Sequence, residues 1–147
     1  MILCDVNVLV YAFRSDVDRH GEYRGWLLER LAGAENVGVS ELVLTQMVRV
    51  VTHPRVFVEP SPPAEAFAFA EAVRSAPNAV LVTPGPRHWD IFGDLCWRAG
   101  AKGNLIWHAY FAAMAIEWGC EWISTDRDFA RFPGLRWRHP LAAPRRS

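Results

Sequence analysis

Residues 1–13, MILCDVNVLVYAF, contain the pattern on which the rest of the chain is built. Residues 2–4 are an apolar run typical of a short buried strand, and the run ends at an acidic residue, Asp5. The apolar residues that follow, up to residue 13, continue as a helix. A buried strand that passes directly into a helix indicates the first unit of an α/β fold.

The same alternation recurs along the whole chain. Further strands are predicted at residues 36–40, 79–84 and 120–125, with a last edge strand at 135–140. Further helices are predicted at residues 20–33, 41–53, 63–76, 87–100 and 104–119. This order predicts a short parallel sheet of four to five strands with helices on both faces. No repeat or linker divides the chain, so a single domain over residues 1–147 is expected.

Composition argues against several classes of protein. Half of the residues are hydrophobic, which excludes a disordered chain. No apolar run reaches the roughly 18 residues of a membrane helix, and no basic region precedes the first apolar stretch as in a signal peptide. The three cysteines, Cys4, Cys96 and Cys120, are odd in number and widely spaced. They indicate neither a disulfide framework nor a structural zinc site, and a cytoplasmic protein is expected.

The charge balance allows two interpretations. The net charge is zero, so bulk electrostatics does not attract the chain to a polyanion. All but one of the 16 basic residues are arginine, the exception being Lys102. Arginine binds phosphate in a bidentate way, which suits nucleic acid. A GC-rich coding sequence would give the same bias, so both explanations stay open.

Acidic residues follow three of the predicted strands. Asp5 follows the first, Glu41 the second, and Asp126 and Asp128 the fourth, while His108 lies near the start of the helix before that fourth strand. The carboxyl ends of parallel strands meet at one edge of a sheet, so we expect these side chains to converge. A cluster of carboxylates repels itself unless a cation neutralises it, and carboxylate oxygens suit Mg²⁺ or Mn²⁺.

Each acid also has a purely structural interpretation. Asp5 and Asp126 fit as helix N-caps, because a carboxylate accepts hydrogen bonds from free backbone N–H groups. Glu41 stands in the first turn of a helix, where the dipole favours a negative charge. Their common position at strand ends favours a functional site over three separate caps.

Four stretches resemble PIN-domain proteins of the VapC toxin type. They are residues 1–13, SELVLTQMVRV at 40–50, HWDIFGDLCWRAGAKGNLIWHAYFAAMAIEWG at 88–119, and STDRDFARFPGLRWRHP at 124–140. The resemblance implies a PIN-like three-layer sandwich and an endoribonuclease that depends on Mg²⁺ or Mn²⁺. It also implies a homodimer and a cognate antitoxin whose tail lies across the active site.

The resemblance assigns roles residue by residue. Asp5, Glu41 and Asp126 match the catalytic, metal-binding acids, and His108 occupies the position of a further metal-binding acid. The supporting residues are Asn7, Thr125 and Asp128. The basic residues nearest the predicted site, and so the candidates for RNA binding, are Arg49, Arg55 and Arg127. A solvated surface position explains these arginines equally well.

His108 leads to two hypotheses about function. Loss of a carboxylate weakens Mg²⁺ binding, and imidazole suits Mn²⁺, Ni²⁺ or Zn²⁺ better. One hypothesis is a metal-dependent endoribonuclease, the toxin of a toxin–antitoxin pair. The alternative is a weakened or inactive PIN-domain protein that binds antitoxin and RNA. A phosphatase with Asp5 as nucleophile is less favoured, because the expected D-x-D pattern is D-x-N here.

Aromatic and apolar residues suggest a core and a binding groove. Core positions are predicted for Trp26, Trp89, Trp118 and Trp122, whereas Trp107 and Trp137 are left open. An apolar groove for an antitoxin helix is one interpretation of Phe67, Phe69, Leu42, Val43 and Met47. Core packing is the other.

Overall fold

One parallel sheet runs through the centre of the molecule. The computed structural model describes residues 1–143, so the last four residues of the expected domain lie outside it. The strands are β1 (Ile2–Cys4), β2 (Val37–Val39), β3 (Ala79–Leu81), β4 (Glu121–Ile123) and β5 (Trp137–Arg138). Their order is β3-β2-β1-β4-β5, and every neighbouring pair is parallel. The predicted parallel sheet of four to five strands is confirmed.

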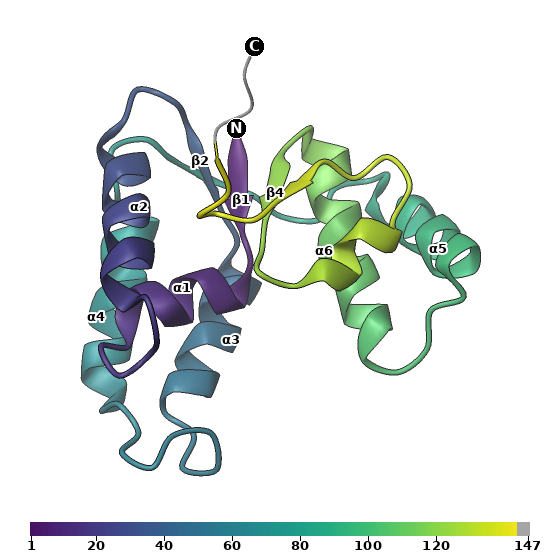
Figure 1. The fold of residues 1–147 in the computed structure, drawn as a ribbon. Helices are drawn as coiled ribbons and strands as arrows, with labels where there is room; N and C mark the ends of the chain where they lie inside the picture. Colours follow the sequence, from purple (N-terminus) through teal and green to yellow (C-terminus); the bar gives the residue numbers. More distant parts are fainter. Residues whose placement is uncertain (144–147) are drawn as a thin grey trace.

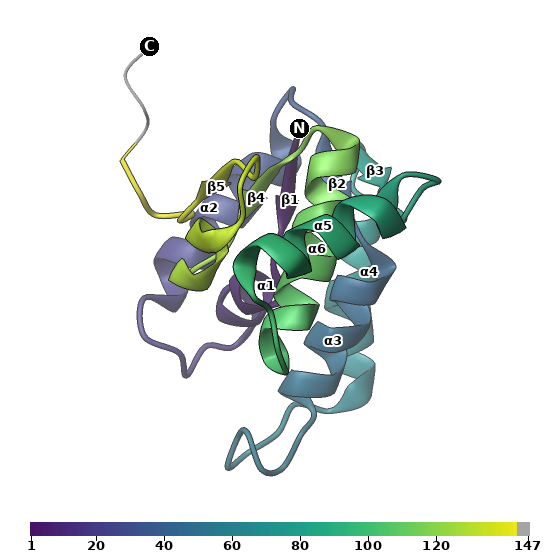
Figure 2. The same ribbon diagram turned by 90° about the vertical axis from the view of Figure 1, so that its right-hand side faces the viewer.

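Helices cover both faces of this sheet. They are α1 (Val6–Phe13), α2 (His20–Ala32), α3 (Glu41–Val51), α4 (Pro63–Arg74), α5 (His88–Ala99) and α6 (Asn104–Trp118), with a short 3-10 helix, η1 (Arg127–Arg131). In Figure 1, α1 and α2 lie to the left of the strands and α5 and α6 to the right. Figure 2 shows α5 and α6 packed together in front of the sheet. The arrangement is the expected three-layer sandwich. Within residues 1–143, no helix has the length and apolar character to cross a bilayer.

Strand β1 is central because its three residues are apolar and buried on both sides. It pairs with β2 on one edge and with β4 on the other, although β4 is far away in the sequence. Gly38 of β2 allows this close packing, since a Cβ atom there would stand 3.0 Å from the Ile2 carbonyl and from Val82. The centre of the sheet is therefore fixed by small and apolar residues.

The pairing of β1 with β4 brings two distant segments together. Cys4 is in register with Ile123, and the next backbone N–H, that of Asp5, donates to the Ile123 carbonyl at 2.8 Å. The chain leaves the sheet at the same point in both segments. Asp5 and the loop that starts at Ser124 are consequently neighbours.

Helix starts follow the sequence with one correction. Ser40 caps α3 through a hydrogen bond from Val43 N to Ser40 Oγ, and Asp5 caps α1. Asparagine is a preferred N-cap, so the sequence predicts Asn104 as the cap of α6, but the cap is Gly103 and Asn104 is the first helical residue. Gly103 has φ +56°, a left-handed value that glycine adopts without a steric penalty.

The predicted tryptophan core is correct only in part. Trp122 is fully buried and packs between Phe111 and Phe129, at centroid distances of 5.6 and 5.3 Å. Trp26 is half-buried, but Trp89 and Trp118 are exposed. Helix α5 packs on α6 with one side, which leaves its other side in solvent (Figure 2). A helical repeat of apolar residues does not reveal how much of a helix its neighbours cover.

Candidate functional site

Asp5 lies at the carboxyl end of β1 with only 8% of its surface exposed. Its Oδ1 accepts a hydrogen bond from Val6 N at 2.7 Å, and its Oδ2 accepts one from Ser124 Oγ at 2.6 Å. Burial raises the pKa of Asp5, because the low dielectric penalises the charged form by more than these hydrogen bonds stabilise it. Asp5 is thus both a helix cap and a partly desolvated acid that faces the site.

Ser124 connects the two strand ends, and the sequence prediction missed it. Besides donating to Asp5, its fully buried hydroxyl accepts from Asp126 N at 3.0 Å and from Asn7 Nδ2 at 3.3 Å. The signal available in the sequence was a serine at the carboxyl end of the predicted fourth strand, two residues before Asp126. A small hydroxyl there can reach both loops at once.

Asn7 and Thr125 form a second link between the same loops. Asn7 Oδ1 accepts from the backbone N–H of Thr125 at 3.3 Å, and Asn7 Nδ2 lies 3.3 Å from Asp5 Oδ2. Thr125 takes part through its backbone and not through its hydroxyl. The amide of Asn7 therefore holds the first turn of α1 against the loop after β4.

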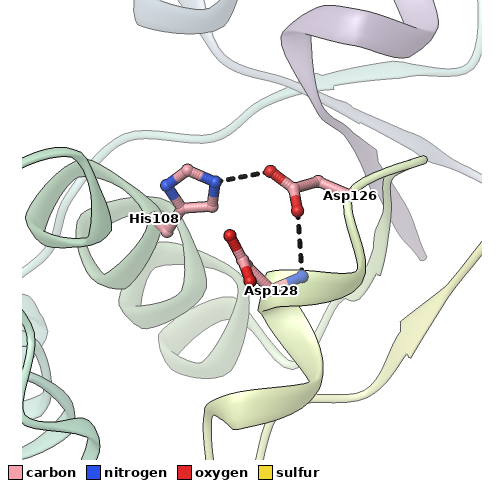
Figure 3. A group of neighbouring side chains, drawn as sticks. All are labelled: His108, Asp126 and Asp128. Carbon is pink, nitrogen blue, oxygen red and sulfur yellow. Dashed lines mark hydrogen bonds and ion pairs between the residues drawn. The ribbon is translucent and has the colours of Figure 1, made fainter.

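His108 points from α6 towards the loop after β4 (Figure 3). Its Nε2 lies 2.7 Å from Asp126 Oδ2, and its Nδ1 lies 2.9 Å from the carbonyl oxygen of Asn104. The other oxygen of Asp126, Oδ1, accepts from Asp128 N at 2.9 Å. Asp126 is therefore held from two sides, by the helix and by its own loop.

These contacts favour the protonated form of the histidine. A carbonyl oxygen and a carboxylate oxygen only accept hydrogen bonds, so both contacts are hydrogen bonds at once when the two ring nitrogens of His108 each carry a proton. Burial alone would lower the pKa of His108, but its hydrogen bonds to Asp126 and Asn104 outweigh this and raise it. The pKa of Asp126 is lowered, because the bonds from His108 and Asp128 N outweigh its own desolvation.

The same side chains offer a mixed set of metal ligands. His108, Asp126 and Asp128 each provide one ligand atom, and these atoms lie within 4.8 Å of one another. The carbonyl of Asn104 holds Nδ1, which is how proteins orient a histidine whose Nε2 binds a metal. One nitrogen and two carboxylates fit Mn²⁺, Ni²⁺ or Zn²⁺ better than Mg²⁺. A cation would have to replace the proton that Nε2 now shares with Asp126.

Glu41 is not brought to this cluster. Its Oε2 forms an ion pair with Arg74 Nε at 2.9 Å, across α3 and α4. It lines a cavity of about 380 Å³ between these helices, together with Leu44, Thr45, Val48, Phe67, Ala70, Glu71 and Arg74. The assignment of Glu41 to the metal stays a prediction that this geometry does not support.

The predicted antitoxin groove differs in its residues. Val43 and Met47 are buried in the core, and Phe69 packs against Phe13 at a centroid distance of 5.0 Å. The apolar surface between α3 and α4 is formed by the lining residues of the Glu41 cavity, with Phe67 exposed at its edge. Of the five residues predicted for the groove, Phe67 lines this cavity, whereas core packing is the correct interpretation of Val43 and Met47.

Two further cavities meet at Asp5 and His108. One has a volume of about 410 Å³ and is lined by Asp5, Gln46, Arg49, Asn104, Trp107 and His108, together with Val6, Phe111 and Phe129. The other, of about 390 Å³, is lined by Asp5, Asn7, His108 and Asp126, together with Val6, Val10, Tyr11, Val50, Val56 and Phe57. The residues of α3 that face Asp5 are therefore Gln46, Arg49 and Val50.

The three arginines predicted to bind RNA occupy different positions. Arg49 lines the Asp5 cavity. Arg55 is exposed in the turn after α3, next to the residues that border the other cavity. Arg127 is exposed at the start of η1, between the two aspartates of the cluster. Contact of these arginines with RNA stays a prediction.

Known proteins resemble this chain in sequence and in fold. The chain is 50% identical over 142 residues to the VapC ribonuclease Mb2897 of Mycobacterium bovis, and the match covers 96% of each chain. It is 44% identical over 140 residues to ribonuclease VapC25 of Mycobacterium tuberculosis, covering 95% of this chain and 99% of the relative.

Solved structures agree in fold at low identity. VapBC2 from Rickettsia felis, bound to a promoter DNA fragment, gives a TM-score of 0.68 at 18% identity over 95% of this chain and 98% of that one. FitAcB from Neisseria gonorrhoeae gives a TM-score of 0.65 at 16% identity. The match covers 97% of this chain and 100% of that one. The PIN domain family model matches residues 2–135. With half of its residues identical to a VapC protein over almost its whole length, the chain belongs to the PIN domain family, in the VapC branch.

Proposed function

We propose that this protein is the ribonuclease toxin of a toxin–antitoxin pair and that it hydrolyses RNA phosphodiester bonds beside Asp5. The relatives at 50% and 44% identity are named ribonucleases, and the family match spans almost the whole chain. The observation that carries the proposal is the convergence of Asp5, Asp126 and His108 from three distant segments onto adjoining cavities. A set of caps without a common function would not need to share a cavity.

The reaction is expected to require a divalent cation, Mn²⁺ or Mg²⁺. Asp126, Asp128 and His108 would hold it, with Asp5 beside them through Ser124. Bound there, the cation supplies a water of lowered pKa and stabilises the negative charge that develops on the phosphoryl group. The nitrogen ligand favours Mn²⁺ over Mg²⁺.

The chain's own residues position the reacting groups. Asp5 is held by Val6 N and Ser124, and it lines both cavities. Arg49, in the larger cavity, offers the phosphate a forked donor. When protonated, His108 adds a positive charge where the family resemblance implies an acid, and it can bind a metal cation only after Nε2 has lost its proton.

The partner that we propose is an antitoxin protein that binds the surface between α3 and α4. Two of the solved structures with this fold are named VapBC proteins, and a groove with Leu44, Val48 and Phe67 suits the apolar side of a helix. We also propose a homodimer in the cytoplasm, where the free thiols of Cys4, Cys96 and Cys120 stay reduced.

The test is cleavage of single-stranded and structured RNA by the purified protein with Mn²⁺ or Mg²⁺. We expect EDTA and the variant Asp126→Asn each to abolish cleavage, because both remove the proposed metal site. Asp5→Asn should lower it strongly while the thermal unfolding temperature stays close to that of the unmodified chain. Cleavage that persists with EDTA and in both variants would rule out the mechanism.

A further inference from the structure

We infer that the larger Asp5 cavity is a subsite for one unstacked RNA base, with Trp107 as the ring on which the base stacks and Arg49 as the contact to its phosphate. The inference rests on the proposed function and names its substrate class, which is single-stranded or looped RNA.

Trp107 stands at the edge of the site. It precedes His108 on α6, lines the same cavity as Asp5, and keeps 50% of its surface exposed. An indole that keeps half of its surface in solvent has room for a second ring to stack on it. The cavity that Trp107 borders is the one that contains Asp5 and His108.

The ring of Trp107 packs against two neighbouring aromatic rings. Its contact with Tyr110 is T-shaped, with centroids 5.5 Å apart and planes at 66°, and the centroid of Phe111 lies 6.3 Å away. Phe111 in turn stacks on the buried Trp122. A ring held in this way loses little conformational entropy when a ligand stacks on it, so it is prepared for binding.

Polar groups around the ring match a nucleotide. Arg49 provides a guanidinium for phosphate, and its Nε lies 3.4 Å from Gln46 Oε1, which orients it. The amides of Gln46 and Asn104 line the same cavity and can donate to and accept from the edge of a base. A flat ring, a phosphate ligand and two amides are what recognition of an unstacked nucleotide uses.

The same features disfavour a protein helix at this position. The cavity beside Asp5 contains two amides, an arginine and an acid, whereas the cavity between α3 and α4 presents Leu44, Val48 and Phe67. A helix that binds by its apolar side therefore has a better surface elsewhere on the molecule. Double-stranded RNA is also disfavoured, because its bases are stacked on one another and offer no free face to Trp107.

The experiment measures binding of a short single-stranded RNA to the Asp5→Asn chain in EDTA, a condition in which no cleavage is expected. Trp107→Ala and Trp107→Phe are compared with Trp97→Ala, whose ring on α5 is 87% exposed and does not border the site. We expect Trp107→Ala to weaken binding roughly 5- to 150-fold, the range of base–aromatic stacking, while Trp107→Phe stays within a few-fold and Trp97→Ala changes nothing.

A series of RNAs that each lack one base identifies the stacked position. At one position, loss of the base and Trp107→Ala should each weaken binding, and their combination should add little further, because both remove the same contact. A duplex of the same sequence should bind equally to the Trp107→Ala and Trp97→Ala chains. Additive effects at every position of the RNA would overturn the subsite.

Two parallel measurements separate the possible failures. Cleavage by the chain with Asp5 intact tests the proposed function alone. If the protein binds RNA through Trp107 but does not cut it, the subsite is supported and the nuclease function is contradicted. Equal RNA binding by the Trp107→Ala and Trp97→Ala chains overturns the subsite, whether or not the protein cuts. A change of molecular mass in solution on Trp107→Ala would assign the ring to a protein interface and would overturn it too.

Discussion

The Nε2 atom of His108 lies 2.7 Å from Oδ2 of Asp126, so a helix of one sheet face is joined to the loop after β4 by a charge-assisted hydrogen bond. When the ring is protonated it also donates to Asn104, and it brings to these acids the positive charge that a divalent cation would otherwise supply. In this form His108 is an internal cation with which an external one must compete.

Replacement of that internal cation by an acid is expected to strengthen metal binding. In His108→Asp, a carboxylate takes the place of the imidazolium next to Asp126 and Asp5, so the site becomes more negative and made of oxygen ligands alone. We expect Mg²⁺ and Mn²⁺ to bind about tenfold more tightly or better, which is ~1.4 kcal/mol. Calorimetric titration of both metals into both chains measures this.

The same variant compares the two hypotheses for activity. A large gain of metal-dependent cleavage in His108→Asp means that the histidine weakens the site, whereas equal cleavage means that the site works with the histidine. His108→Asn is the matched control, since it removes the imidazolium without adding a charge. Equal metal affinity in all three chains would contradict the assignment of position 108 to the metal site.

Stability without metal is expected to depend on pH through the same pair. The pKa of His108 is raised in the folded chain, so its contribution is fully present below the unfolded value of 6.5 and is lost as the pH rises through the folded value. Both side chains are partly exposed, which limits the contribution to about 1 kcal/mol.

The measurement is the free energy of unfolding of the unmodified chain minus that of His108→Gln, in EDTA, on both sides of pH 6.5. Glutamine keeps a donor but does not titrate. His139, whose pKa is lowered by burial and by nearby arginines, is present in both chains and cancels in the difference. A difference that grows with rising pH would have the wrong sign for a raised pKa.

Removal of the Ser124 hydroxyl is expected to destabilise both the fold and the site. In Ser124→Ala, Asp5 Oδ2 loses its shortest hydrogen bond, Asp126 N loses its acceptor, and Asn7 Nδ2 keeps only its contact with Asp5. The expected cost is ~1–3 kcal/mol, with cleavage reduced in parallel because Asp5 is no longer held.

Thermal or urea unfolding measures this cost, and Ser75→Ala is the control. The hydroxyl of Ser75 also makes a hydrogen bond, to the Glu71 carbonyl, but on an exposed part of α4. Its removal in Ser75→Ala should change the free energy of unfolding by no more than ~0.5 kcal/mol. Similar losses in the two variants would mean that Ser124 does not join the two strand ends.

The fold was predictable because local signals agree with one another. The buried run at β1, the caps Asp5 and Ser40, and the alternation of strands and helices all indicate a parallel sheet, and parallel strands place Asp5 beside Asp126. Ser124 was not predicted, since a serine at the end of a strand has many uses. Its role depends on three partners that only the pairing of β1 with β4 brings together.

The rotation of α3 was the part that sequence alone left undecided. The side chains at 41, 44, 45 and 48 share one face, and this face meets α4. Gln46, five residues after Glu41, lies about 140° away around the helix and faces Asp5. Glu41 was recognisable in the sequence as a candidate acid. Whether the Glu41 face or the Gln46 face of α3 points to the site depends on how α3 packs against α1 and α4.

Because α3 turns Gln46 and not Glu41 towards Asp5, variants at these two positions are expected to differ in their effect on metal binding. Because Glu41 pairs with Arg74 away from Asp5, we expect Glu41→Gln to leave metal affinity and RNA cleavage within about twofold, at a stability cost of ~0.2–1 kcal/mol for an exposed ion pair. Gln46→Glu should instead tighten Mn²⁺ and Mg²⁺ binding, because it adds a carboxylate to the cavity that contains Asp5 and His108. Metal titration and cleavage assays on both single variants and on the double variant test this. A large loss of metal binding in Glu41→Gln, with no gain in Gln46→Glu, would show that α3 presents its Glu41 face to the metal when the site is filled.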